Sequence, residues 1–196
     1  MITDNDIVFE FDDSLSNKNE RDYSYFGWEW NGVIAFETIA EGYFTAAESV
    51  YQRFASLEGD KSELDMLGYP IYFLYLHYVN LYIQGLYYRY TDKGVCENFL
   101  EQHHCLKELW DGIEPSLRKL TELVASSMSV SALKSYVYQM HEFAQKYLSM
   151  LYPRRENFTA ESPESLKLNV VNLHARMNDF KNAIEKLNCD LSDLAV

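Results

Sequence analysis

The chain has 196 residues, of which 47% are hydrophobic, and its formal net charge is −13 at pH 7. That length suits one well-filled core and is short for two. Contact with phosphate needs lysine and arginine, so an acidic balance disfavours binding to nucleic acid. Three cysteines are too few and too oddly numbered for a disulfide framework, which favours a reducing compartment.

No part of the chain reads as a membrane span or a signal peptide. The most apolar stretch carries His77, Asn80 and Gln84 near its middle, and the N-terminus lacks the basic and then apolar pattern of a secretion signal. We therefore expect a cytoplasmic protein without membrane contact. Residues 1–65 hold 15 acidic and 4 basic side chains, a net of −11. This surplus either keeps the protein soluble or makes a docking surface for a basic partner.

The N-terminal segment, residues 1–26, is predicted to be an acidic and partly extended arm. Ile7 to Phe11 alternate apolar and polar side chains, which indicates a short strand or an extended arm. The polar residues that follow have no means of burying a core. Residues 27–190 then read as a single helical domain.

Two long helices open that domain. An amphipathic pattern runs from about residue 27 to residue 57, and its apolar positions recur at steps of three and four. Those positions are Phe36, Ile39, Tyr43, Ala47, Val50, Phe54 and Leu57. A tyrosine-rich central helix is predicted to start at Gly68-Tyr69-Pro70, with Pro70 in the first turn, and to run to Tyr90. Because this helix is apolar on most of its circumference, we expect it to be buried on most of it.

Further helical patterns follow the central helix. One covers about Phe99 to Trp110, another begins at Pro115, and a long one spans Val130 to Leu151. Ser162-Pro163-Glu164 is a start signal for the last helix, which reaches about Leu187. The chain is therefore predicted to be all-α, a bundle of about five long helices plus short ones.

A polar stripe of His77, Asn80 and Gln84 interrupts the central helix at steps of three and four. Polar side chains in a buried helix need partners, because each unpaired group costs about 1–3 kcal/mol. We expect the stripe to lie inside the bundle with His104 nearby. Two imidazoles and two amides would bind a small polar ligand or pass a proton. Alternatively, they bond each other and fix the register of the helices.

Two other groups of side chains are candidate sites. Arg154 and Arg155, the only adjacent arginine pair, form a candidate anion site in a loop, or else two solvated charges. Cys96, His103, His104 and Cys105 are metal-ligand types, but adjacent positions on a helix point in different directions and do not converge. We predict no metal site and no cofactor, since phosphate loops and common catalytic motifs are absent from the sequence.

Three motifs give the chain a resemblance to the HEPN superfamily of helical domains. The central helix resembles the pattern P-x-x-F-L-x-x-H-x-x-E-L-x-x-K, here Pro70, Phe73, Leu74, His77, Asn80, Leu81 and Gln84. A later segment resembles H-x-L-x-x-L-W, here His104, Leu106, Leu109 and Trp110. A third, F-R-Y-P in the family, reads Met150, Leu151, Tyr152 and Pro153. The resemblance covers about residues 42–187 and implies a HEPN-like fold that tends to dimerise.

The departures from the family pattern concern its chemistry. Asn80 and Gln84 stand where the pattern has an acid and a base, and Leu151 stands where it has an arginine. HEPN ribonucleases share an R-x(4–6)-H motif. No arginine of this chain has a histidine at that distance. The resemblance thus implies the fold but not the ribonuclease activity.

The leading hypothesis is a non-catalytic HEPN-like protein that acts through protein contacts as a homodimer. The family context suggests a toxin–antitoxin, stress or phage-defence system, which is an analogy of fold. One alternative is an enzyme that processes nucleotides or RNA with His77 and His104. Another is an acidic decoy that occupies a nucleic-acid-binding site through the N-terminal third.

Overall fold

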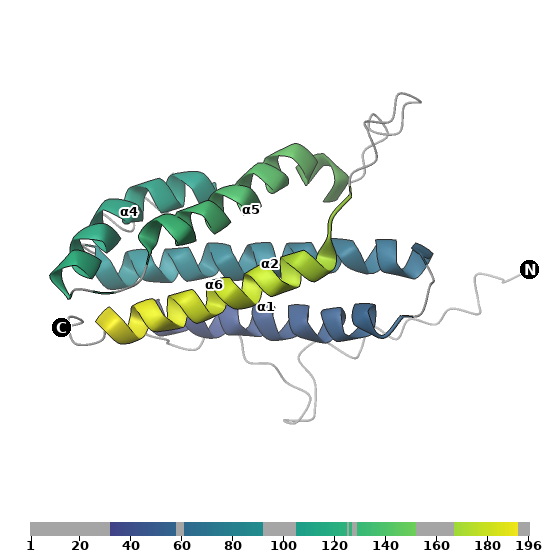
Figure 1. Ribbon diagram of the computed structural model, residues 1–196, viewed down its shortest axis with the longest axis horizontal. Coiled ribbons are helices and arrows are strands. Elements are labelled where there is room, and N and C mark those ends of the chain that lie inside the picture. Colours follow the sequence, from purple (N-terminus) through teal and green to yellow (C-terminus); the bar gives the residue numbers. More distant parts are fainter. Residues whose placement is uncertain are drawn as a thin grey trace, which may run out of the picture. The chain divides into compact units, whose positions relative to one another are not determined.

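The computed structural model describes residues 32–57, 61–91, 105–124, 126, 129–151 and 167–191. They form five helices, and no strand occurs among these residues. The helices are α1 (Gly32–Ala55), α2 (Lys61–Tyr90), α4 (Leu106–Leu123), α5 (Val130–Leu151) and α6 (Val170–Leu191) (Figure 1). The prediction of an all-α helical bundle is confirmed. The acidic segment 1–26 lies outside the described residues.

Helix α2 is the centre of the bundle, because it contacts each of the other four described helices. Its buried residues cover more than half of its circumference, as its nearly uniform apolar composition requires. They are Ile71, Tyr72, Tyr75, Tyr78, Val79, Tyr82, Ile83, Gly85, Leu86 and Tyr87. Even so, among the described helices none is long and apolar enough to cross a membrane.

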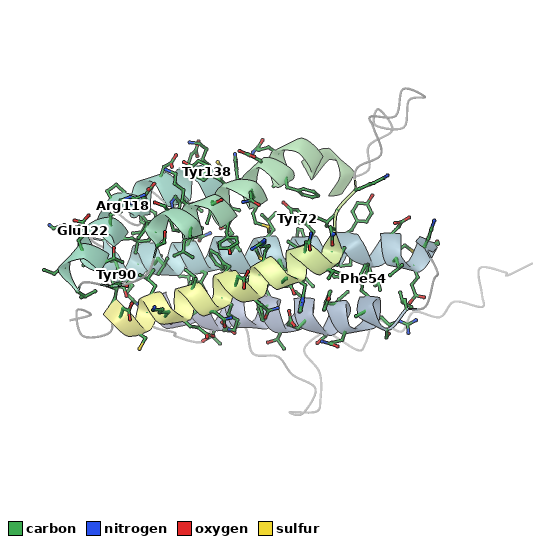
Figure 2. The ribbon with its side chains drawn as sticks, in the orientation of Figure 1. Phe54, Tyr72, Tyr90, Arg118, Glu122 and Tyr138 are labelled. Atoms are coloured by element: carbon green, nitrogen blue, oxygen red, sulfur yellow. The ribbon has the colours of Figure 1, made fainter. Side chains whose placement is uncertain are left out.

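The buried tyrosines of α2 bring hydroxyl groups into the core, and most of these groups have partners. Tyr72 donates to the backbone carbonyl of Met140 on α5 at 2.9 Å, where the two helices face each other (Figure 2). Tyr75 donates to a carboxylate of α1, and Tyr82 accepts from an amide of α6. Burial raises the pKa of all three phenols far above the usual range. The hydroxyls therefore stay neutral and tie α2 to three different helices.

Helices α1 and α2 form an antiparallel hairpin, and this is the most extensive contact of the described chain. Arg53 pairs with Glu63 at 2.6 Å near the turn, and Arg89 pairs with Glu37 at 2.7 Å near the other end. Beside the pair of Arg89 with Glu37, the helices approach closely at Gly85, where an added Cβ would lie 3.2 Å from the Cβ of Phe36. A side chain at position 85 would push the two helices apart.

The remaining helices cover other sides of α2. Helices α4 and α5 pack against each other as a second antiparallel pair, since Lys134 contacts Glu114 and Tyr138 contacts Asp111 (Figures 1 and 2). Helix α6 buries a stripe of apolar side chains at steps of three and four. This stripe consists of Val170, Leu173, Met177, Phe180, Ile184, Leu187 and Leu191.

The predicted start of the central helix was wrong. Helix α2 begins at Lys61, so Pro70 lies in its interior and not in its first turn. An interior proline removes one helical hydrogen bond and costs about 3 kcal/mol in a helix. Tertiary packing of Leu67 on the core offsets part of this cost, and the exposed pair of Glu63 with Arg53 of α1 adds about 1 kcal/mol or less. The exposed position of Pro70 spares the ring from clashes with other helices.

Two further boundaries also differ from the prediction. Helix α4 runs through Gly112 and Pro115 without a break, because its buried face continues across them from Leu106 to Thr121. The last helix does not start at residues 162–164, since residues 167–169 are not helical. Asn169 caps it instead, with its side-chain oxygen accepting from the backbone N–H of Asn172 at 2.9 Å.

We expect Pro70→Ala to raise the free energy of unfolding by about 2 kcal/mol. Alanine restores the missing N–H in the middle of α2, a gain of about 3 kcal/mol, while the unfolded chain regains about 1 kcal/mol of entropy. Urea denaturation measures the change, with the neighbouring Tyr69→Ala, at a half-exposed side chain, as the control for altered surface. A neutral or destabilising effect of Pro70→Ala would contradict a helix that continues through this position.

Candidate functional site

The polar stripe of α2 lies at the edge of the bundle and is not enclosed in it. His77, Asn80 and Gln84 are each half-buried, so the expected position inside the core was wrong. The imidazole of His77 stacks on Tyr43 of α1, with ring centroids 5.0 Å apart and planes at 21°, and meets Phe73 edge-on at 4.3 Å. The stripe is half-buried because the opposite side of α2 holds the core contacts with α4, α5 and α6.

Within the stripe, the two amides bond each other. Gln84 donates its Nε2 to the Oδ1 of Asn80 one turn earlier. This bond leaves the Nδ2 of Asn80 and the Oε1 of Gln84 without a partner among the described residues. Partial burial lowers the pKa of His77 below its usual range, so the imidazole is neutral at pH 7. The stripe therefore presents one amide donor, one amide acceptor and an uncharged ring.

Several predicted site residues cannot be placed in this arrangement. His104, Arg154 and Arg155 lie outside the described residues, as do Cys96 and His103. The acidic surface proposed for residues 1–65 depends in large part on residues 1–31, which are outside them as well. The ligand site of His77 with His104 and the anion site of Arg154 and Arg155 thus stay predictions.

The polar stripe belongs to a larger surface without formal charge. Helix α1 contributes Ile39, Gly42, Tyr43, Ala46 and Val50, which recur at steps of three and four, and α2 contributes Met66, Phe73, His77, Asn80 and Gln84. We call these ten residues the uncharged face. The stack of Tyr43 on His77 joins its two halves.

Parts of the uncharged face are open. Met66 is 63% exposed and Ile39 is 44% exposed, so the face offers apolar area on both helices. A Cβ added to Gly42 would meet no atom within 4 Å. The ion pair of Arg53 with Glu63 lies at one end of this face, where it neutralises both side chains. An open, uncharged surface that spans two helices is typical of an interaction site.

A second cluster, which the sequence analysis missed, lies between α1, α2 and α6. Glu48 of α1 accepts from the hydroxyl of Tyr75 through one oxygen, and its other oxygen lies 3.0 Å from Nε2 of His174 on α6. Tyr51 stacks on the imidazole of His174 with centroids 3.6 Å apart and planes at 7°. Asn178 donates to the backbone carbonyl of His174 at 3.0 Å. Together these contacts hold the imidazole in one orientation.

The same side of α6 continues this pattern with further polar contacts. Lys181 binds Glu41 of α1 at 2.5 Å, and Asn188 donates to the hydroxyl of Tyr82 at 2.7 Å. His174, Lys181 and Asn188 are spaced by seven residues, as are Glu41 and Glu48 on the antiparallel α1. We call these contacts the α6 polar seam. The sequence contains a signal for this seam. Polar residues recur every seven positions on both α1 and α6, whereas the other inward positions of these helices are apolar.

The α6 polar seam has features of a catalytic dyad, but its contacts are those of a structural pair that holds α6 against α1. A carboxylate beside an imidazole orients a general base, which requires the other ring nitrogen to reach a substrate. Here Tyr51 covers one face of the ring, and both oxygens of Glu48 are already occupied. The geometry fixes the register of α6 against α1, the best-attested use of polar groups in a helix interface.

Two other groups in the described part of the chain carry no open site. Cys105, at the N-terminal cap of α4, lies with its Sγ 3.7 Å from Nδ1 of His141 on α5. No cluster of three or more metal-ligand side chains occurs among the described residues. On α4, burial favours a higher pKa for Glu114, but hydrogen bonds from Lys134 and Arg118 hold that pKa below the usual range. Both cations are thus held by the carboxylate of Glu114.

Comparison of the chain with family models, with curated proteins and with solved structures gives no match. The class that the fold defines is therefore the all-α helical bundle described above.

We expect Glu48→Ala to lower the free energy of unfolding by about 1–3 kcal/mol. The substitution leaves the buried hydroxyl of Tyr75 without its acceptor, and a buried unpaired donor costs about that much. Glu41→Ala is the matched control, because Lys181 keeps its contact with Glu185 at 3.1 Å. Chemical denaturation should show a clearly smaller loss of unfolding free energy for Glu41→Ala than for Glu48→Ala. Equal losses would contradict a special role of Glu48 in the seam.

Proposed function

We propose that this chain is a HEPN-like, non-catalytic helical protein that acts through protein contacts and forms a homodimer through the uncharged face. The all-α bundle around α2 and the resemblance of Pro70, Phe73, Leu74 and His77 to the family pattern support the family assignment. The same resemblance suggests a toxin–antitoxin, stress or phage-defence system as the context, by analogy of fold.

The observation that best supports the proposed homodimer is the absence of formal charge on the uncharged face. A two-fold axis places the same patch of both subunits in contact, so side chains near the axis meet their own copies. In a protein of net charge −13, most acidic surfaces would repel themselves in this way. The uncharged face has no such repulsion, and its exposed Ile39 and Met66 supply apolar area to bury. A second copy of the chain is therefore the partner that suits it.

The amides of the polar stripe fit the same partner. Asn80 presents a donor and Gln84 an acceptor that find no partner in the described part of the chain. Across a two-fold axis, the donor of one subunit meets the acceptor of the other, because the operation exchanges them. A self-complementary pair of this kind favours a second copy over an unrelated apolar partner.

The surroundings of His77 also disfavour the enzymatic alternative. The ring contacts are aromatic, from Tyr43 and Phe73, and neither residue orients a general base. The described residues of this face include no arginine beside His77 that would steady a phosphate. These features support protein contact in place of RNA cleavage.

We expect Gly42→Glu to weaken the dimer by at least about tenfold in Kd. The position opens onto free space, so the longer side chain fits the folded subunit. Two like charges brought together at the two-fold interface would each lose solvation and repel the other. Sedimentation velocity across micromolar concentrations measures the dissociation constant.

Gly42→Ala is the matched control for this variant. Alanine gains about 1 kcal/mol of helix propensity and adds no charge, so the subunit should be more stable and still dimerise. A wild-type protein that sediments as a monomer at every concentration would overturn the proposed homodimer. Equal Kd values for the two Gly42 variants would move the interface away from the uncharged face.

We also expect the purified protein to show no metal-independent ribonuclease activity. The prediction rests on the missing R-x(4–6)-H motif and on the net charge of −13, which weakens attraction to RNA. Structured and single-stranded RNA are incubated with the parent protein and with His77→Ala and His104→Ala variants. Cleavage by the parent that either variant loses would support the enzymatic alternative, while cleavage shared by all three indicates a contaminant.

A further inference from the structure

We infer that His77 makes the homodimer pH-sensitive, so that mild acidification separates the two subunits. The inference rests on the proposed function, since it concerns the same uncharged face. It adds a means of regulation to that face, with a proton as the ligand and the imidazole of His77 as its site.

The position of His77 is the first reason. Its ring lies between Tyr43 of α1 and Phe73 of α2 and is half-buried even within one subunit. It sits in the same stripe as Asn80 and Gln84, one turn from the amide pair that would meet its copy. A second subunit placed on this face would remove more water from the ring, and a charged ring resists such burial.

The groups that face His77 provide no compensation for a positive charge. Tyr43 is the titratable group that contacts it from α1, and from its own helix it meets Phe73. No Asp or Glu of the described residues forms an ion pair with it. Contact with the face of Tyr43 favours a cation, but less than burial of the ring disfavours one. The lowered pKa of His77 agrees with burial as the stronger effect.

The sign of the effect follows from linkage. His77 must be neutral in the dimer, so the free subunit binds a proton more readily than the dimer does. Acid therefore favours free subunits, and each dimer that separates takes up two protons. An imidazole of ordinary pKa, about 6.5, would raise Kd about 100-fold between pH 7.5 and pH 5.5. Since burial lowers the pKa of His77 already in the subunit, we expect a measurable rise of Kd that is smaller than about 100-fold.

The overall charge of the protein predicts the opposite trend, which makes the effect diagnostic. The isoelectric point is about 4.7, so acidification from pH 7.5 to pH 5.5 reduces the net negative charge. Reduced repulsion strengthens non-specific self-association. A dimer that weakens over this interval must therefore respond to a particular group.

Sedimentation velocity on the full chain at pH 7.5 and pH 5.5, at constant ionic strength, tests the inference with two variants. His77→Gln keeps a neutral polar side chain and should dimerise equally well, or better, at pH 5.5. His77→Arg carries a permanent charge and should already have a raised Kd at pH 7.5. Thermal unfolding followed by circular dichroism at both pH values verifies that each variant is folded.

The outcomes separate the inference from the proposed function. A wild-type Kd that rises with acid, together with a His77→Gln Kd that does not, supports the inference. A dimer of equal affinity at both pH values overturns the inference alone, as does an acid response that persists in His77→Gln. A monomer at both pH values overturns the proposed homodimer and, with it, the pH response.

Discussion

The burial of α2 is the constraint on which the rest of the structure depends. A helix with tyrosine or aliphatic side chains on most of its circumference must be covered on most of it, and it also brings phenolic hydroxyls into the core. An unpaired buried donor costs about 1–3 kcal/mol, so most of these hydroxyls take a partner from another helix, whereas the buried hydroxyl of Tyr78 has none among the described residues. The backbone of Met140, the carboxylate of Glu48 and the amide of Asn188 supply three of these partners. Helices α5, α1 and α6 are therefore positioned by hydrogen bonds as well as by apolar contact.

The α6 polar seam adds specificity to a core that apolar contact alone would leave free to slide. Steps of seven residues place His174 against Glu48 and Lys181 against Glu41 in a single register. A shift of α6 by one turn would separate His174 from Glu48 and Lys181 from Glu41, which is costly for half-buried charged groups. The same argument explains why His174 and Glu48, although arranged like part of a catalytic dyad, are best understood as a structural pair.

The uncharged face is the part of α1 and α2 that the other described helices do not cover. Helices α1, α4, α5 and α6 all contact α2 but leave its polar stripe only half covered. The polar stripe and the open side chains of Ile39 and Met66 remain at this boundary, without formal charge in an acidic protein. An enclosed polar stripe would suggest a ligand site, whereas a half-exposed stripe beside apolar side chains is better suited to contact with a partner.

The sequence by itself determined the all-α class and the central place of the tyrosine-rich helix, because the spacing of apolar residues reports which faces are buried. It misplaced the start of α2, since local signals at Pro70 indicate a boundary, whereas the helix continues through Pro70 and the residues before it pack on the bundle through Leu67. It also identified His77, Asn80 and Gln84 as one stripe but put them inside the bundle. Which side of α2 the other helices cover, and which acid of α1 meets His174, are relations between distant segments. Only the tertiary structure decided them, because helical periodicity describes one helix and not its neighbours.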